Sequence, residues 1–264
     1  MSWPKINWRI WLPIEHERGY LIPAINSGDV DYELCAQVLR ESILDHHGHA
    51  HVTIVTRDML PFGDQGGQAN DWQLFRISPY RQTIKLEADM IAAGPIDHWW
   101  TLFEHRDVVI SQGCRDFYDQ PSTNRFYRRL FDVNHLPDVY NAITYWRVCP
   151  LAKDFFDLVR QIFSHWNHFQ TLLKFADREA TTDVVYAMAA QIIGPELVTL
   201  PAGIGPEITH MKQHVIGCRT RDWTRELVWE TRPLRINTVA QHGLFHYHIK
   251  SWAKEYHDVS RTNH

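Results

Sequence analysis

Two acidic residues, Glu87 and Asp89, lie one residue apart directly after residues 83–86 (TIKL), which predict a short strand. Because side chains alternate along extended chain, both carboxylates should project to the same side where the chain leaves the sheet. Two carboxylates placed in this way can hold one Mg²⁺ or Mn²⁺ ion, with phosphate oxygens of a substrate completing the shell. The spacing therefore indicates metal-assisted handling of a diphosphate. The alternative is an exposed strand end that carries two solvated acids.

The segments before this strand alternate between strand and helix patterns. Residues 19–26 (GYLIPAIN) and 51–56 (HVTIVT) are apolar and β-branched, and apolar residues recur at helical spacing between them, after a possible cap at Asp29 or Asp31. This order predicts an α/β fold with a mixed, mainly parallel sheet flanked by helices. Ligands of such sheets bind beyond the carboxyl ends of the strands. Asn26, the loop after residue 56 and the Glu87/Asp89 pair should therefore share one edge of the sheet.

The rest of the chain continues the mixed pattern. We expect helices over residues 95–103, 150–173 and 181–193, strands over residues 107–111 and 140–146, and a flexible loop over residues 61–67 (PFGDQGG). The apolar faces of the helices should pack in the core.

Length and composition indicate a globular protein. The chain has 264 residues, of which 44% are hydrophobic and 22% are charged, so disordered, collagen-like and coiled-coil classes are excluded. We expect one domain over residues 1–264. The formal net charge of −4 gives no global attraction to nucleic acid, so DNA binding would need a local basic face.

Cysteine usage and hydropathy predict a cytoplasmic location. The four cysteines are far apart and show no C-x-x-C pairing, as is typical of reduced, mostly buried residues: Cys35, Cys114, Cys149 and Cys218. No run of residues approaches the roughly 20 apolar residues of a membrane span, so we expect no membrane contact.

Other chemical motifs are weak or missing from the sequence. The chain has no G-x-x-x-x-G-K-[ST], G-x-G-x-x-G or H-E-x-x-H, which argues against P-loop phosphotransferases, dinucleotide oxidoreductases and zincin peptidases. Residues 46–51 (HHGHAH) suggest a metal cluster, but they fall where the first long helix should end. Polar and cationic residues favour helix C-termini, so we interpret this cluster as an exposed helix end.

The strand followed by Glu87-Ala88-Asp89 resembles the D-x-D element of GT-A-fold glycosyltransferases, which hold the diphosphate of a nucleotide-sugar through a metal. Other segments resemble this family in the same order, over about residues 20–252: the first strand at 19–26, the start of a helix at Asp31-Tyr32, the N-x-G strand at 136–146 (LPDVYNAITYW), the acceptor-side acid at Thr182-Asp183, and the H…K-x-W element at 245–252 (FHYHIKSW). The chain departs from the family in two places. Glu87 replaces the first Asp of D-x-D, and Ala142 stands where Gly is usual.

The resemblance implies a nucleotide-sugar half at about residues 19–111 and an acceptor half at about residues 112–264. It also implies roles for residues distant in the chain. Glu87 and Asp89 would bind Mn²⁺ or Mg²⁺ with His246 or His248, and we prefer His246 because it follows the apolar Phe245. Lys250 would contact the phosphates and offset charge on the leaving diphosphate. The expected donor is a UDP-sugar. On the nucleotide side, the residues implied to hold it are Ala24, Asn26, Asp31 and Tyr32. Asn141 and Asp183 are implied to face the sugar and the acceptor. Tyr32 and Trp72 are the aromatic candidates for stacking on the base, although core packing is the ordinary role of such residues.

A looser resemblance concerns residues 78–90 (SPYRQTIKLEADM), 136–147 (LPDVYNAITYWR) and 209–214 (THMKQH), which are similar to predicted glycosyltransferases of large tailed phages. It implies transfer of a hexosyl or pentosyl group to a 5-hydroxymethylpyrimidine, such as hydroxymethylcytosine, in double-stranded DNA. For a phage-encoded protein, the expected location is the host cytoplasm. A basic, aromatic-rich set could track the phosphates: Arg125, Arg128, Arg129, Lys212, Arg219, Arg221 and Trp223. These residues are equally explained as solvated surface. The alternatives are transfer to a protein or glycan hydroxyl, and a non-catalytic binding module with the same fold.

Overall fold

The structure is a computed structural model of the whole chain. It describes residues 13–25, 28–122, 128–175, 179–201, 203–211, 219–220 and 222–262, without the side chains of residues 128 and 129. Several predicted residues lie outside this part of the chain: Asn26, Arg125, Lys212, Cys218 and Arg221.

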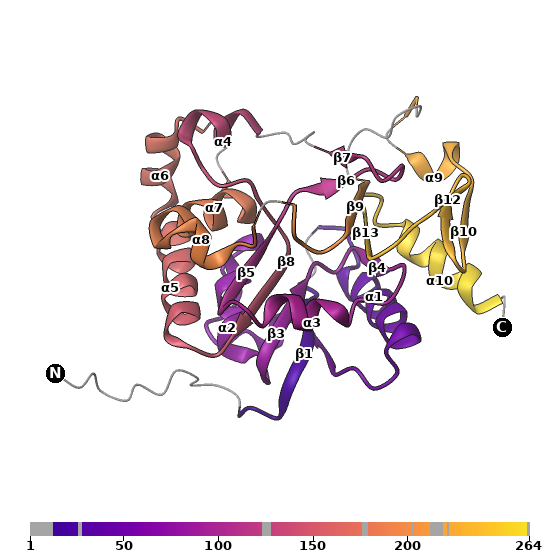
Figure 1. Cartoon of the computed structure of the whole chain (residues 1–264), viewed down its shortest axis with the longest axis horizontal. Helices are drawn as coiled ribbons and strands as arrows, with labels where there is room; N and C mark the ends of the chain where they lie inside the picture. The colour runs from indigo at the N-terminus through magenta and orange to yellow at the C-terminus, as the bar shows by residue number, and fades with distance from the viewer. Residues whose placement is uncertain are drawn as a thin grey trace.

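The centre of the molecule is a mixed five-stranded sheet (Figure 1). Its strand order is β2 (Val52–Val55), β1 (His16–Pro23), β3 (Tyr80–Leu86), β8 (Val139–Arg147) and β5 (Val108–Gln112). Strands β2, β1 and β3 are parallel, whereas β8 pairs antiparallel with both β3 and β5. The predicted α/β class with a mixed sheet is confirmed, and the carboxyl ends of β1, β2 and β3 share one edge as expected.

A second five-stranded sheet packs beside this edge. Its order is β4 (Met90–Ala92), β13 (Leu244–Tyr247), β9 (Ile208–Met211), β6 (Cys114–Arg115) and β7 (Pro121–Ser122). Strand β4 begins one residue after Asp89, so this second sheet joins the end of the central strand β3 to a strand from the C-terminal part of the chain. A small three-stranded sheet follows β9 in sequence: β10 (Trp229–Thr231), β11 (Leu234–Ile236) and β12 (Val239–Ala240).

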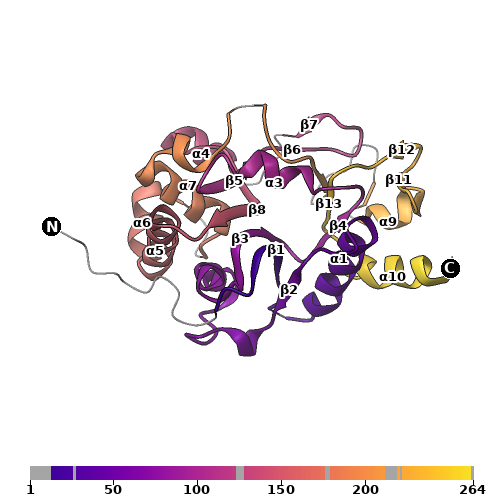
Figure 2. The same cartoon turned by 60° about the horizontal axis from the view of Figure 1, so that its bottom comes forward.

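Helices flank the central sheet. In both views α5, α6 and α7 lie together on one side, whereas α1 and α10 lie on the other (Figures 1 and 2). Figure 1 shows α8 on the same side as α7. Among the described residues, the α-helices are α1 (Tyr32–His46), α2 (Leu74–Ile77), α3 (His98–Phe103), α4 (Arg128–Asn134), α5 (Pro150–Ser164), α6 (Trp166–Leu173), α7 (Thr182–Ile193), α8 (Pro195–Val198), α9 (Trp223–Glu226) and α10 (Trp252–Thr262). The 3₁₀ helices in this part of the chain are η1 (Arg57–Met59) and η2 (Gly67–Gln73).

Cap residues account for several helix starts. The Asp31 side chain accepts a hydrogen bond from the Leu34 N–H at 2.9 Å and so begins α1. Thr181 caps α7 in the same way, and Pro150 occupies the first turn of α5, where no N–H is needed. The single helix expected over residues 150–173 is instead two helices, α5 and α6, because the chain leaves helical geometry at His165.

Two apolar clusters, one on each face of the central sheet, form the core. Tyr20 and Ile22 of β1 belong to one cluster, and Leu21 between them belongs to the other, as strand alternation requires. Ile84 and Leu86 of β3 follow the same rule and pack toward α1. Lys85, between them, is buried on the α5/α7 face, where polar side chains surround it.

Candidate metal and diphosphate site

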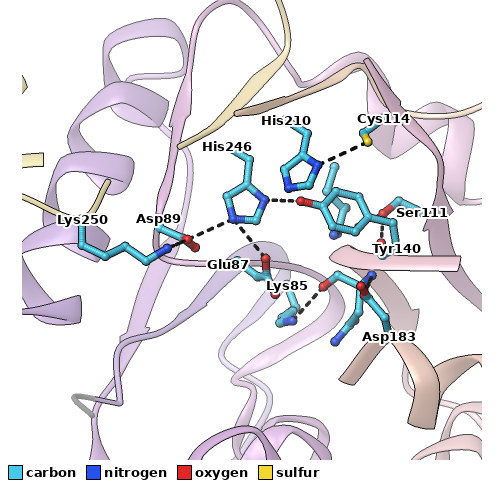
Figure 3. A network of polar contacts seen from close by, with 12 residues as sticks. Lys85, Glu87, Asp89, Ser111, Cys114, Tyr140, Asp183, His210, His246 and Lys250 are labelled. Carbon is cyan, nitrogen blue, oxygen red and sulfur yellow. Dashed lines mark hydrogen bonds and ion pairs between the residues drawn. The ribbon is translucent and has the colours of Figure 1, made fainter. Parts of the chain in front are cut away.

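Glu87, Asp89 and His246 converge at the end of β3 (Figure 3). The Nε2 atom of His246 lies 3.0 Å from an Asp89 carboxylate oxygen and 3.3 Å from a Glu87 carboxylate oxygen. One ligand atom from each residue falls within 4.8 Å of the other two, and within the described residues this is the one group of three such side chains that could hold a metal. Two carboxylates and an imidazole suit Mn²⁺, and the carboxylates also suit Mg²⁺.

Strand pairing brings these distant residues together. β13 runs antiparallel to β4, with His246 opposite Met90, and the Tyr247 N–H donates to the Asp89 carbonyl at 3.1 Å. Gly243, just before β13, has a left-handed φ of 60°, and a Cβ there would lie 2.3 Å from the Glu207 carbonyl oxygen. A side chain at this position would push β13 away from β9 and so displace His246. His248, the alternative ligand, is exposed and lies outside the group, which supports the choice of His246.

Tyr140 of β8 orients the imidazole of His246. Its hydroxyl group forms a hydrogen bond with His246 Nδ1, which leaves Nε2 directed at the two carboxylates (Figure 3). Both side chains are buried. Burial raises the pKa of Tyr140 well above its ordinary value of 10, and the nearby Glu87 carboxylate adds to the shift. The phenol is therefore neutral at physiological pH, and it can fix the imidazole without adding a negative charge.

Replacing Tyr140 with Phe should weaken Mn²⁺ binding by roughly 10–100-fold, as for other residues that orient a metal ligand. The substitution removes the hydrogen bond to Nδ1 but keeps the aromatic ring in the core. Electron paramagnetic resonance titration of free Mn²⁺ would give the dissociation constant. A lower melting temperature with unchanged Mn²⁺ affinity would show that the hydroxyl group only stabilises the fold.

Lys250 contributes a cation beside the carboxylates. Its ammonium group forms an ion pair with Asp89 and lies 5.9 Å from the ring centroid of Tyr32. The Lys250 side chain is 21% exposed, so it can reach a ligand without unfolding the surrounding elements. A divalent ion together with this ammonium group would match the charge of a diphosphate.

These groups open into a cavity of about 250 Å³ at the carboxyl edge of the parallel strands. Glu87, Asp89 and Lys250 line one part of it, and Tyr32 with the residues after β1 lines another. Segment 67–74 completes the wall. The cavity thus combines two carboxylates, the Lys250 ammonium group and the aromatic ring of Tyr32. Such a lining suits a ligand that carries both charged groups and a planar ring.

The predicted nucleotide-side residues occupy different positions. Tyr32 lines the cavity, as expected for a residue near a base. Asp31 uses its carboxylate to cap α1, and Ala24 is packed in the core, although Pro23 and Ile25 beside it line the cavity. Their contacts with a nucleotide stay predictions, as does that of Asn26 outside the described residues.

Asn141 and Asp183 belong to one buried network. The Asp183 carboxylate accepts from the Asn141 backbone N–H at 2.7 Å, and the Asn141 amide donates to Asp71 at 3.0 Å. Asp71 and Lys85 line the cavity, whereas Asn141 and Asp183 stand behind them. The predicted contacts of Asn141 and Asp183 with sugar and acceptor also stay predictions.

The sequence argument missed the cavity wall formed by segment 67–74. Residues 61–66 form a loop, as predicted, and Gly67 begins η2. Hydrogen bonds tie this loop to η2: the Gln65 N–H donates to Asn70 at 2.7 Å, and Gln73 donates to the Gly63 carbonyl at 2.9 Å. The available signal was a run of amides and acids, DQGGQANDWQ, directly before buried apolar residues. Asn70 and Gln73 are almost fully buried, which such residues rarely are without a structural or binding role.

The other sequence interpretations have mixed outcomes. His46 ends α1 and His47 caps it, and His46, His49 and His51 are exposed, which confirms the exposed helix end. Trp72 is buried against Phe62, as an ordinary core residue. The assignment of Trp223 to a phosphate-tracking face is wrong, because it is 1% exposed and packs on Trp252 and Phe245. Arg219 is exposed, and the side chains of the other five members of that set lie outside the described residues.

Comparisons with known proteins gave similarity at the level of structure. No protein-family model matches the chain, and no curated protein matches it in sequence. An active-site mutant of LgtC has 10% identity and a TM-score of 0.48, with 92% of this chain and 95% of that chain covered. A glycosyltransferase involved in glycosylation of the major capsid of PBCV-1 has 10% identity and a TM-score of 0.46, with 91% and 98% covered. Mouse xyloside xylosyltransferase 1 has 10% identity and a TM-score of 0.46, with 87% and 97% covered.

Hydropathy gives one further finding. Within the described residues, no helix combines the length and apolar character that crossing a membrane would require.

Proposed function

We propose that this protein is a metal-dependent glycosyltransferase of the GT-A type that uses a nucleotide-diphosphate sugar, with UDP-sugar as the expected donor. The observation that carries the proposal is the convergence of Glu87, Asp89 and His246 beside Lys250 at the mouth of a polar cavity. Carboxylate ligands and a nearby ammonium group are suited to a diphosphate and unsuited to an apolar ligand.

The residues present fit Mn²⁺ or Mg²⁺, which would supply Lewis-acid stabilisation of the diphosphate as it leaves. Glu87, Asp89 and His246 would hold the ion, and Lys250 would exchange its contact with Asp89 for a phosphate oxygen. In the transfer, the bond between the anomeric carbon and the phosphate oxygen breaks, and the acceptor hydroxyl oxygen bonds to that carbon. The hydroxyl proton passes to the departing diphosphate or to solvent. Tyr32, which lines the cavity, would pack against the nucleotide.

The acceptor is a hydroxyl group, and we propose 5-hydroxymethylpyrimidine in double-stranded DNA as the first candidate to test. The support is the phage resemblance of three sequence segments and the chemistry of a primary hydroxyl exposed in the major groove. A hydroxyl of a protein or glycan would serve the same donor site equally well. Whether the transferred group is a hexose or a pentose follows from the donor that is used.

Turnover of nucleotide-sugars would test this function and separate an enzyme from a binding module. With Mn²⁺ and a panel of UDP-, GDP- and TDP-sugars, we expect slow release of nucleoside diphosphate without acceptor, and faster release with the right acceptor. Mass spectrometry of hydroxymethylated DNA, unmodified DNA of the same sequence and hydroxyl-bearing glycans would identify the product. Metal-dependent binding of a nucleotide-sugar without turnover of any donor would favour a non-catalytic binding module. Absence of metal-dependent binding to every nucleotide-sugar would reject the proposed function.

A further inference from the structure

A second pair of charged residues, Asp71 and Lys85, lines the same cavity outside the metal group. The Lys85 side chain is 3% exposed and that of Asp71 is 10% exposed. Lys85 Nζ donates to the Asn141 carbonyl at 3.0 Å and lies 3.5 Å from Asp71 Oδ2. The pair therefore places one positive and one negative charge in the buried wall of the cavity.

Packing does not explain this pair. The neighbours of Lys85 in β3, Ile84 and Leu86, are apolar. Strand alternation directs the Lys85 side chain to the opposite face, where α5 and α7 pack. Desolvation of two charges can exceed their mutual attraction, so a buried ion pair is poor evidence of a gain in stability. A role toward a polar ligand would account for keeping the pair beside a cavity.

The two oxygens of Asp71 have different surroundings. Oδ2 accepts from the Asn141 amide at 3.0 Å and from the Tyr186 hydroxyl at 2.7 Å, in addition to the contact with Lys85. Burial raises the pKa of Tyr186 well above its ordinary value of 10, so this phenol stays a neutral donor. Oδ1 has no hydrogen bond to any residue that the structure describes. The carboxylate is thus fixed by three groups through one oxygen, and the other oxygen can accept from a ligand.

We propose that Asp71 and Lys85 bind hydroxyl groups of the donor sugar and that they select neutral sugars over acidic ones. This inference rests on the proposed function, because it assumes that a nucleotide-sugar occupies the cavity. Asp71 Oδ1 accepts from a sugar hydroxyl, and a remaining N–H of Lys85 donates to a hydroxyl oxygen. Paired carboxylate and ammonium groups satisfy both the donor and the acceptor character of hydroxyls. A uronic acid would add a carboxylate next to Asp71, where the charge of Lys85 is already shared between Asp71 and the Asn141 carbonyl.

Calorimetric titrations in excess Mn²⁺ would test this selectivity with UDP, UDP-glucose, UDP-galactose, UDP-xylose and UDP-glucuronic acid. The wild-type protein should bind at least one neutral donor about tenfold or more tightly than UDP-glucuronic acid, as expected for hydrogen bonds to charged groups. Asp71→Asn should reduce that preference to about threefold or less, and it should leave the affinity for UDP within about twofold, because UDP has no sugar to contact position 71.

Asp258→Asn is the matched control. It makes the same chemical change at an exposed position of α10 that does not line the cavity, so it should keep both the affinity for UDP and the preference for neutral donors. If Asp71→Asn keeps the full preference, or if the wild-type protein binds UDP-glucuronic acid as tightly as every neutral donor, the assignment of the pair is overturned. The comparison of wild-type affinities for neutral donors and UDP-glucuronic acid tests the selectivity even if Asp71→Asn does not fold. Absence of Mn²⁺-dependent UDP binding would instead reject the proposed function, and this inference with it.

Discussion

Replacing Asp89 with Asn should abolish detectable Mn²⁺-dependent binding of UDP and lower turnover of the donor by roughly 10²–10³-fold, as when one electrostatic catalytic group is lost. Asp89 contacts both His246 and Lys250, so the substitution removes a proposed metal ligand and also the ion pair of the ammonium group. Asn keeps the shape of the side chain, and we therefore expect only a small change in melting temperature. Glu87→Gln should act in the same direction with a smaller effect, because Glu87 is more exposed, at 24%.

Asp258→Asn in α10 makes the same chemical change at an exposed position away from the cavity. It should match the wild-type protein in metal binding, UDP binding and turnover. Wild-type activity in Asp89→Asn, measured with both variants in the same assay, would reject Asp89 as a metal ligand.

His246→Ala should weaken Mn²⁺ binding by at least about a hundredfold, since loss of a ligand should cost no less than loss of a residue that only orients one. His248→Ala, two residues away, should leave the affinity within about twofold, because His248 is exposed and outside the group. His246 is fully buried and bonded to Tyr140, so its replacement should also lower the melting temperature.

His246→Gln separates the two effects, because it fills more of the space and retains a polar side chain. It should restore part of the stability and little of the Mn²⁺ affinity. Equal, small effects of the substitutions at positions 246 and 248 on Mn²⁺ affinity would show that the segment containing both histidines has only a structural role.

Local sequence patterns predicted much of the central sheet. Strands β1, β2, β3, β5 and β8 lie within about three residues at either end of the predicted segments, because apolar alternation and cap residues such as Asp31 act over short distances. The Glu87/Asp89 pair could be found for the same reason. His246 required the resemblance, since no local signal relates a histidine in β13 to an acid 157 residues earlier in the chain.

The second sheet and the cavity wall could not be predicted in this way. Strands β4, β6 and β7 are two or three residues long, which is too short for a periodic pattern. Asp71 and Lys85 meet only because η2 folds back against β3 and β8, and this contact is set by tertiary packing. The split between α5 and α6 was hidden because the apolar period continues through His165.

The most direct test of the metal and diphosphate site is a calorimetric titration of UDP into the wild-type protein, once with MnCl₂ and once with EDTA. Glu87, Asp89, His246 and Lys250 together predict binding of one UDP per chain with Mn²⁺, and at least tenfold weaker binding, by roughly 1.4 kcal/mol or more, in EDTA. Equal affinity in the two titrations, or no binding of UDP, GDP or TDP in either, would contradict a metal-dependent nucleotide-sugar site.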